Sequence, residues 1–154
     1  IVLGVGLAGG RAELSLERVA INVDDARIPD KDGQQPIDRP IVAGGPAAYF
    51  TGLPVKRAVA ALREAGLPAI VSNTAGTFVC NHIFYGLMHL VANRRLPVRG
   101  GFLHVPYLPE QAAGLAGIQV PSMALDDIVR GIEIILRVAA AHSEDIVAAE
   151  GAIA

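Results

Sequence analysis

The chain has 154 residues, of which 52% are apolar and 18% are charged, and its net charge is −2 at pH 7. This composition excludes a disordered chain, and the length suits one domain with a substantial core. The longest basic run is Arg94-Arg95, so neither nucleic acid nor an anionic membrane is expected as a partner. The longest uncharged stretch, 65–93, is broken by Pro68 and by polar residues, so no membrane span is predicted. The single cysteine cannot form an internal disulfide, which predicts a reducing, cytoplasmic location.

The chain opens on an apolar run, Ile1–Gly6, that predicts a buried strand. Because no methionine begins the chain and the strand is already under way, we expect residues 1–154 to form a single domain that lacks its own N-terminal part. The glycine-rich turn at 6–11 contains the spacing Gly4-x-Gly6-x-x-Gly9, which partly matches a dinucleotide-binding pattern. No helical periodicity follows this turn, so a nucleotide cofactor is not predicted.

Alternating apolar residues then predict a strand over Glu17–Val23, with one well-buried face. Residues 29–46 are rich in Pro, Gly, Asp and Gln, which is typical of a long surface loop. The apolar spacing over Val55–Ala65 predicts a helix, and Gly66 with Pro68 ends it.

A short strand over Ala69–Ser72 is followed by a turn and by a largely enclosed helix from about Phe78 to Asn93. Gly101–Val105 predicts the next strand, and Ser122 is the expected N-cap of the last helix. Strands that alternate with helices predict an α/β domain with a mainly parallel sheet, in three layers with helices on both faces.

Cys80 is the first candidate for chemistry. A lone cysteine in an apolar chain is more often an inert small hydrophobic residue. Cys80, however, follows a strand and a turn and falls in the first turn of the helix 78–93. Helix N-terminal amides stabilise a thiolate, which predicts a lowered thiol pKa, and they can also hold a developing oxyanion.

A catalytic thiol needs a proton acceptor, and the sequence offers four histidines. His82 lies two positions after Cys80, so it faces the opposite side of the helix. His89 is more than two turns away along that helix, and His142 is in the tail. His104 is at the carboxyl end of a strand, where open α/β sheets place their sites, and it is the preferred base. The alternative is a structural histidine at a strand end.

Spacing does not single out the acid that would orient this imidazole. Glu17 heads the predicted strand 17–23, which would hold it rigidly, although an acidic residue before Arg18 is usually solvated. Asp24, Asp25 and Asp30 are also available, so the choice stays open at this point. No Cys/His cluster has the spacing of metal ligands, so no metal is predicted.

The sequence resembles the pyroglutamyl peptidase I family over most of its length. The segments that carry this resemblance are GLAGGR (6–11), ERVAINVDDARIPD (17–30), GPAAYF (45–50), SNTAGTFVCNHIFYGLMH (72–89), RGGFLHVPYLPEQ (99–111) and PSMALDDIVRGIE (121–133). Members of the family are cysteine peptidases with an α/β fold that remove N-terminal pyroglutamate from peptides and proteins. The resemblance implies an enzyme without metal or organic cofactor that assembles as a homo-oligomer, a tetramer in the family.

The family's catalytic triad of Glu, Cys and His falls on Glu17, Cys80 and His104. The resemblance also implies that Arg27 helps to bind the oxyanion and that Phe78 forms one wall of the substrate pocket. Main-chain groups at Leu7, where members of the family often have Gln, are the implied partners of the lactam ring.

Two other functions are weighed against this one. The first is a catalytically inactive, truncated homologue with only an assembly role, which would not react with a thiol reagent at neutral pH. The second is a glycosyl or phosphoryl transferase of similar α/β layout, which a phosphate-dependent activity would reveal. No cluster of anion-binding residues supports the transferase.

Overall fold

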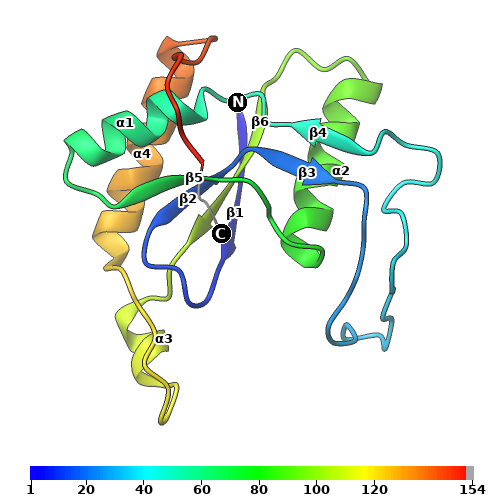
Figure 1. Cartoon of the computed structure of the whole chain (residues 1–154), viewed down its shortest axis with the longest axis horizontal. Helices are drawn as coiled ribbons and strands as arrows, with labels where there is room; N and C mark the ends of the chain where they lie inside the picture. The colour runs from blue at the N-terminus through cyan, green and yellow to red at the C-terminus, as the bar shows by residue number, and fades with distance from the viewer. Residues whose placement is uncertain (152–154) are drawn as a thin grey trace.

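The structure, a computed structural model, describes residues 1–151. Its centre is a four-stranded sheet with the order β1-β6-β2-β5 (Figure 1). The strands are β1 (Val2–Leu7), β6 (Gly100–Val105), β2 (Leu14–Glu17) and β5 (Ala69–Ser72). The β1–β6 and β2–β5 pairs are parallel and the central β2–β6 pair is antiparallel, which confirms an α/β fold with a mainly parallel sheet.

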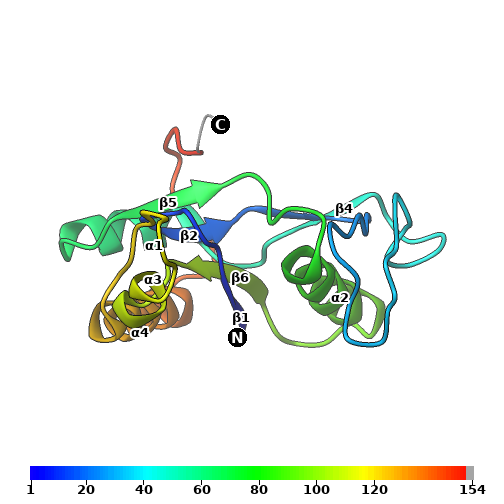
Figure 2. The same cartoon turned by 90° about the horizontal axis from the view of Figure 1, so that it is seen from below.

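Helices cover both faces of this sheet. On one face α1 (Val55–Glu64) and α4 (Leu125–Ala141) enclose a core that includes Leu16 and Leu103, here called the α1–α4 cluster. Phe102 points to the other face of the sheet. There it packs with Phe84 of α2 (Val79–Asn93) in a second core, here called the α2 cluster. Figure 2 shows α2 and α4 on opposite sides of β1 and β6.

The strand predicted over Glu17–Val23 is wrong in its bounds. The chain forms β2 earlier, at Leu14–Glu17, and then joins a second sheet in which β3 (Val19–Ile21) pairs with β4 (Ala48–Phe50). Between them the Arg18 amide donates to the Ser72 carbonyl at 2.8 Å. Glu17 therefore ends a strand instead of heading one, and it is buried because β2 lies between β5 and β6.

Two further expectations need correction. β1 lies at the edge of the described sheet, and Val2 and Val5 are 42% and 48% exposed, so it is not the buried strand that its apolar sequence predicts. The last helix begins at Leu125 with Ala124 as N-cap, because Ser122 is still extended and forms a bridge with Tyr107.

The remaining predicted elements are confirmed within a residue at each end: α1, β5, α2 and β6. The sequence did not predict β4 or the short helix α3 (Pro109–Ala113), which lies in the connection from β6 to α4. Within residues 1–151, no helix combines the length and apolar character that crossing a bilayer requires.

Candidate active site

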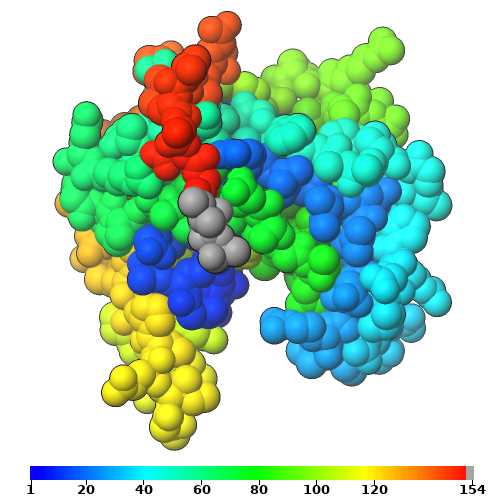
Figure 3. Space-filling model, viewed as in Figure 1, coloured from blue at the N-terminus to red at the C-terminus, as the bar shows by residue number. Residues whose placement is uncertain are grey.

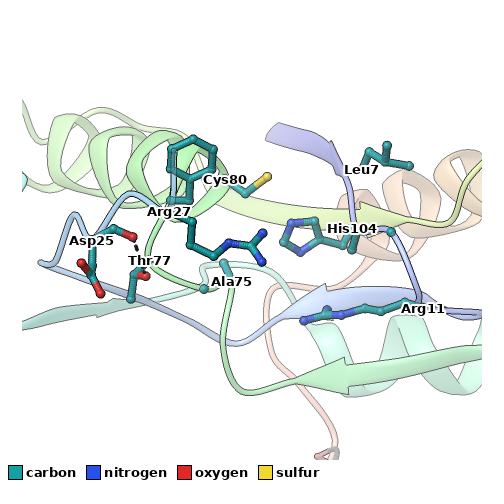
Figure 4. Close-up of a pocket in the computed structure, with 12 residues that line it drawn as sticks. Leu7, Arg11, Asp25, Arg27, Ala75, Thr77, Cys80 and His104 are labelled. Atoms are coloured by element: carbon teal, nitrogen blue, oxygen red, sulfur yellow. Dashed lines mark hydrogen bonds between the residues drawn. The ribbon is translucent and has the colours of Figure 1, made fainter. Parts of the chain in front are cut away.

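A cavity of about 390 Å³ opens where the carboxyl ends of β1 and β6 meet the N-terminus of α2. Figure 3 shows the surface hollowed between the dark blue turn after β1 and the lighter blue loop after β3. The lining includes five of the predicted site residues, namely Leu7, Arg27, Phe78, Cys80 and His104. In Figure 4 the side chains of Cys80, His104 and Arg27 extend into the same space. The sixth predicted residue, Glu17, does not line the cavity and is hydrogen-bonded to His104.

Cys80 is the second residue of α2, as expected from the sequence. Phe78 is the N-cap residue, with extended backbone angles (φ −115°, ψ −154°), and its own side chain forms no capping hydrogen bond within the described part of the chain. The first amides of a helix have no partner within the helix, so the amides of Val79 and Cys80 can donate to a ligand at the thiol. The start of α2 therefore offers a nucleophile together with hydrogen-bond donors for an oxyanion.

The start of α2 is anchored to β3 by Asn81, a residue that is completely buried. Its amide nitrogen Nδ2 donates to the carbonyl oxygens of Ile21 at 2.9 Å and Val23 at 3.0 Å, and its Oδ1 accepts from the Ile21 amide at 3.0 Å. These bonds fix the residue next to Cys80 against the second sheet. Sequence reasoning missed Asn81, because its polar character alone does not indicate which backbone groups it satisfies.

The thiol and the imidazole share Gly6 as a neighbour. A Cβ atom built on Gly6 would lie 2.8 Å from Cys80 Sγ, and Gly6 pairs with His104 in the parallel register of β1 and β6. The ring of Phe102 completes this packing, since its centroid is 5.2 Å from that of His104 and 5.8 Å from that of Phe84. The imidazole is therefore held by the same aromatic packing that forms the α2 cluster.

His104 is oriented by Glu17. The antiparallel register places Ser15 opposite His104, so Glu17, two residues further along, projects from the same face of the sheet. His104 Nδ1 lies 2.7 Å from Glu17 Oε1, and the two residues are 5% and 0% exposed. Because a carboxylate only accepts, Nδ1 carries the proton, and Nε2 of the neutral ring is left as the acceptor for the thiol.

Of the other acids that spacing left open, Asp24 and Asp30 have other side-chain partners, and Asp25 bonds to Thr77 through its backbone. Asp24 Oδ2 lies 2.8 Å from Nδ1 of His82, the histidine that its place on the helix disfavours as the base. This pair is separate from the Glu17–His104 pair. Asp25 lines the cavity, but its backbone amide donates to the Thr77 carbonyl at 2.8 Å and its carbonyl accepts from Thr77 Oγ1 at 3.2 Å (Figure 4). Asp30 Oδ1 accepts the amides of residues 32 and 34 within its own loop, at 2.9 and 2.8 Å.

Arg11 is a site residue that the sequence did not indicate. It lies in the turn after β1, lines the cavity, and its Nη1 donates to Glu17 Oε1 at 2.8 Å. The glycines of this turn resemble part of a dinucleotide-binding pattern. The residue of the turn that contacts the buried Glu17 is Arg11. Only the fold reveals this contact, because β2 must place Glu17 beneath the turn.

The thiol environment differs from the one expected at a helix start. Burial raises the pKa of the Cys80 thiol, the Glu17 carboxylate raises this pKa further, and the Arg11 guanidinium lowers it. The expectation of a lowered pKa is therefore wrong, because burial outweighs the positive charge beside the thiol. The thiol keeps its proton at neutral pH, so a nearby base must remove that proton during any attack.

An α/β domain that brings a thiol and an imidazole to one cavity, with a buried carboxylate hydrogen-bonded to that imidazole, defines a cysteine-type hydrolase. In the described residues, 1–151, no three His, Cys, Asp or Glu side chains are grouped so that they could hold a metal ion.

Known proteins identify the family. A sequence profile described as "Pyroglutamyl peptidase" matches residues 1–142. The chain is 62% identical to pyrrolidone-carboxylate peptidase 1 of Ralstonia nicotianae over 151 residues, which are 98% of this chain and 69% of that protein. It is 58% identical to pyrrolidone-carboxylate peptidase of Erwinia tasmaniensis, over 99% of this chain and 70% of that protein. The chain belongs to the pyroglutamyl peptidase family, as the resemblance of its sequence predicts.

Solved structures agree with this assignment. The crystal structure of pyroglutamyl peptidase I from Bacillus amyloliquefaciens superposes with a TM-score of 0.90 at 50% identity, over 96% of this chain and 69% of that one. A mutant pyrrolidone carboxyl peptidase (E192Q) from Pyrococcus furiosus superposes with a TM-score of 0.89 at 42% identity, over 92% of this chain and 69% of that one. The mixed sheet and its helices are thus the fold of this family.

Proposed function

We propose that the protein hydrolyses the bond after an N-terminal pyroglutamate in peptides, with Cys80 as nucleophile, His104 as general base and acid, and Glu17 as the residue that orients His104. One observation carries these roles: the Glu17–His104 hydrogen bond of 2.7 Å holds the imidazole in the cavity that contains the thiol. The substrate follows from the names of the relatives, which are pyrrolidone-carboxylate and pyroglutamyl peptidases. None of these observations favours an inactive homologue or a transferase.

The first chemical step forms a tetrahedral intermediate. Cys80 Sγ attacks the carbonyl carbon that joins the pyroglutamyl ring to the next residue, while His104 Nε2 takes the thiol proton. Because the raised thiol pKa disfavours a free thiolate, the attack depends on removal of this proton by His104. The negative charge that develops on the carbonyl oxygen is stabilised by the Cys80 amide and by the Arg27 guanidinium.

The next steps release both products. His104 donates its proton to the leaving amine, the C–N bond breaks, and the pyroglutamyl group remains on Sγ as a thioester. A water molecule then attacks the same carbonyl while His104 takes a proton from it. The C–S bond breaks, the sulfur regains a proton from His104, and pyroglutamate leaves. Glu17 remains ionised throughout and stabilises the imidazolium that forms in each half of the reaction.

Specificity follows from the chemistry of the ring. Pyroglutamate is a compact, uncharged lactam with one donor and one acceptor, so its site needs apolar walls and a few fixed polar partners. Phe78 and Ala75 line the cavity as apolar surface, and main-chain groups at Leu7 are the proposed partners of the lactam. Proline lacks the ring carbonyl, so its binding would leave a donor unpaired and would be rejected strongly.

The test compares hydrolysis of pyroglutamyl-p-nitroanilide with hydrolysis of prolyl-p-nitroanilide. The wild-type protein is expected to release nitroaniline from the first substrate only, and Cys80→Ala is expected to abolish release while its circular dichroism spectrum stays unchanged. Near-normal turnover by Cys80→Ala, or equal turnover of both substrates by the wild-type protein, would contradict the proposed function.

We also propose a reducing compartment such as the cytoplasm and a homo-oligomeric state. The compartment is supported by the free thiol of Cys80, the single cysteine of the chain. The oligomer is supported by large apolar side chains that are exposed on β1 and α2, including Val5 (48%) and Ile83 (51%). Sedimentation velocity would measure the oligomeric state, and a concentration-independent monomer would contradict this proposal.

A further inference from the structure

Arg11 and His104 contact the same carboxylate oxygen. Arg11 Nη1 lies 2.8 Å from Glu17 Oε1, and His104 Nδ1 lies 2.7 Å from that same atom. The guanidinium is held in place by further contacts, from Nη1 to Ser72 Oγ at 3.4 Å and from Nη2 to the Thr74 carbonyl at 3.3 Å. Arg11 is thus fixed between the cavity and the buried acid.

The negative charge of Glu17 is balanced by the positive charge of Arg11. The side chain of Glu17 is 0% exposed, and its second oxygen, Oε2, is buried and has no hydrogen-bond partner among residues 1–151. The ionised carboxylate therefore depends on the partners of Oε1, because an uncompensated buried charge is strongly unfavourable. The guanidinium of Arg11 balances the charge of the Glu17 carboxylate. Among the described residues, the other ion-pair partner of Glu17 is His104, which could balance this charge without Arg11 only by taking up a proton.

We propose that Arg11 is a positioning residue which neutralises Glu17 and so keeps His104 in its uncharged, proton-accepting form, and that it thereby sets the pH range of catalysis. The inference rests on the proposed function, because the pH range is that of the peptidase reaction. Arg11 acts through Glu17, and no contact of Arg11 with the substrate is required.

Other charged groups around the triad do not replace Arg11. Asp25 and Arg27 line the cavity from the loop after β3, but the ion pairs of Glu17 among the described residues are those with Arg11 and His104. On α2, His82 is already paired with Asp24. The field of Arg11 also reaches the nucleophile, because Arg11 lowers the pKa of the Cys80 thiol.

The experiment measures kcat/KM for pyroglutamyl-p-nitroanilide against pH in the wild-type protein and in two variants. Arg11→Gln removes the charge, and both limbs of the profile are expected to move to higher pH by about 1–2 units, the effect of one close charge. Arg11→Lys keeps the charge, so its limbs are expected at the wild-type positions with a lower rate. Arg137→Gln, which breaks an exposed ion pair on α4, is the matched control.

A second readout does not depend on turnover. The pH dependence of Cys80 alkylation by iodoacetamide is expected to move to higher pH in Arg11→Gln, and Arg11→Met replaces that variant if it does not fold. If the wild-type protein is active and the pH profile of kcat/KM does not move in Arg11→Gln, this inference is overturned and the proposed function stands. An inactive wild-type protein would contradict the proposed function, and an unmoved alkylation curve would then overturn the role of Arg11 as well.

Discussion

Gly6 and Cys80 are so close that no side chain fits between them. A Cβ atom on Gly6 would lie 2.8 Å from Cys80 Sγ and 3.0 Å from the ring of Phe102. Gly6→Ala is therefore expected to displace the thiol and to lower kcat on the order of 100-fold, the cost of a misplacement of about 1 Å. Gly86→Ala on α2 is the control, because its Cβ would meet nothing within 4 Å. Full activity in Gly6→Ala would show that the thiol reacts from another position.

Glu17→Gln keeps the size of the side chain but removes its charge. We expect turnover to fall by up to about 10⁴-fold, as in other triads that lose the orienting acid. Because the Glu17 carboxylate raises the pKa of Cys80, the same substitution is expected to move thiol alkylation to lower pH. This direction is opposite to the one expected for Arg11→Gln. Wild-type activity in Glu17→Gln together with an inactive His82→Ala would assign the base to His82.

The pH dependence of Cys80 reactivity follows from its raised pKa. Burial disfavours the thiolate, so the folded protein is expected to form thiolate only at a higher pH than an ordinary thiol. Alkylation by iodoacetamide, followed by mass spectrometry, is then slower at neutral pH in the folded protein than in urea-unfolded chain. A folded curve that lies at lower pH than the unfolded one would mean that the helix start, and not burial, controls the thiol.

Asn81→Ala tests the anchor of α2. The substitution leaves the Ile21 amide and the carbonyls of Ile21 and Val23 without their side-chain partner. We expect it to lower the free energy of unfolding by roughly 2 kcal/mol or more and to lower kcat, because unpaired buried groups are costly and Cys80 is adjacent. Asn93→Ala at the exposed end of α2 is the control in urea denaturation. Equal stability of the two variants would contradict an anchoring role.

Phe78→Ala tests the wall of the cavity. Removal of the ring is expected to cost on the order of 1–3 kcal/mol of apolar contact and to act mainly on KM. Phe50, which is 70% exposed and does not line this cavity, provides the control Phe50→Ala. An unchanged kcat/KM in Phe78→Ala would place its ring outside the substrate contact.

Elements with a single clear periodicity could be predicted from the sequence. The apolar spacing of α1 and the stop at Gly66, whose φ is +77°, define that helix in both sequence and structure. β2 was misplaced because Ser15 and Glu17 make it look polar, although all of its residues are buried. The burial of Glu17 depends on His104 of β6 and on Arg11 of the turn after β1, which a local pattern does not contain.

The site was predicted in part for the same reason. Cys80 and His104 lie at element boundaries that the sequence reveals, and the family resemblance selected Glu17 among several acids. Arg11 and Asn81 could not be found by spacing, because Arg11 contacts the far end of the strand that follows it and Asn81 contacts Ile21, 60 residues earlier in the chain. The direction of the Cys80 pKa shift also depends on burial in three dimensions, which outweighs the local effect of a helix start.

Phe102 links the interior of the protein to its chemistry. This ring packs against Phe84 within the α2 cluster and against the imidazole of His104, and it lies where a Cβ atom on Gly6 would be placed. Selection for thermal stability and selection for turnover therefore act on a single side chain. Variants that gain stability by refilling the α2 cluster are expected to shift His104 and lose activity, whereas the α1–α4 cluster lies on the opposite face of the sheet from that imidazole. Directed evolution for heat resistance should accordingly accumulate its changes under α1 and α4.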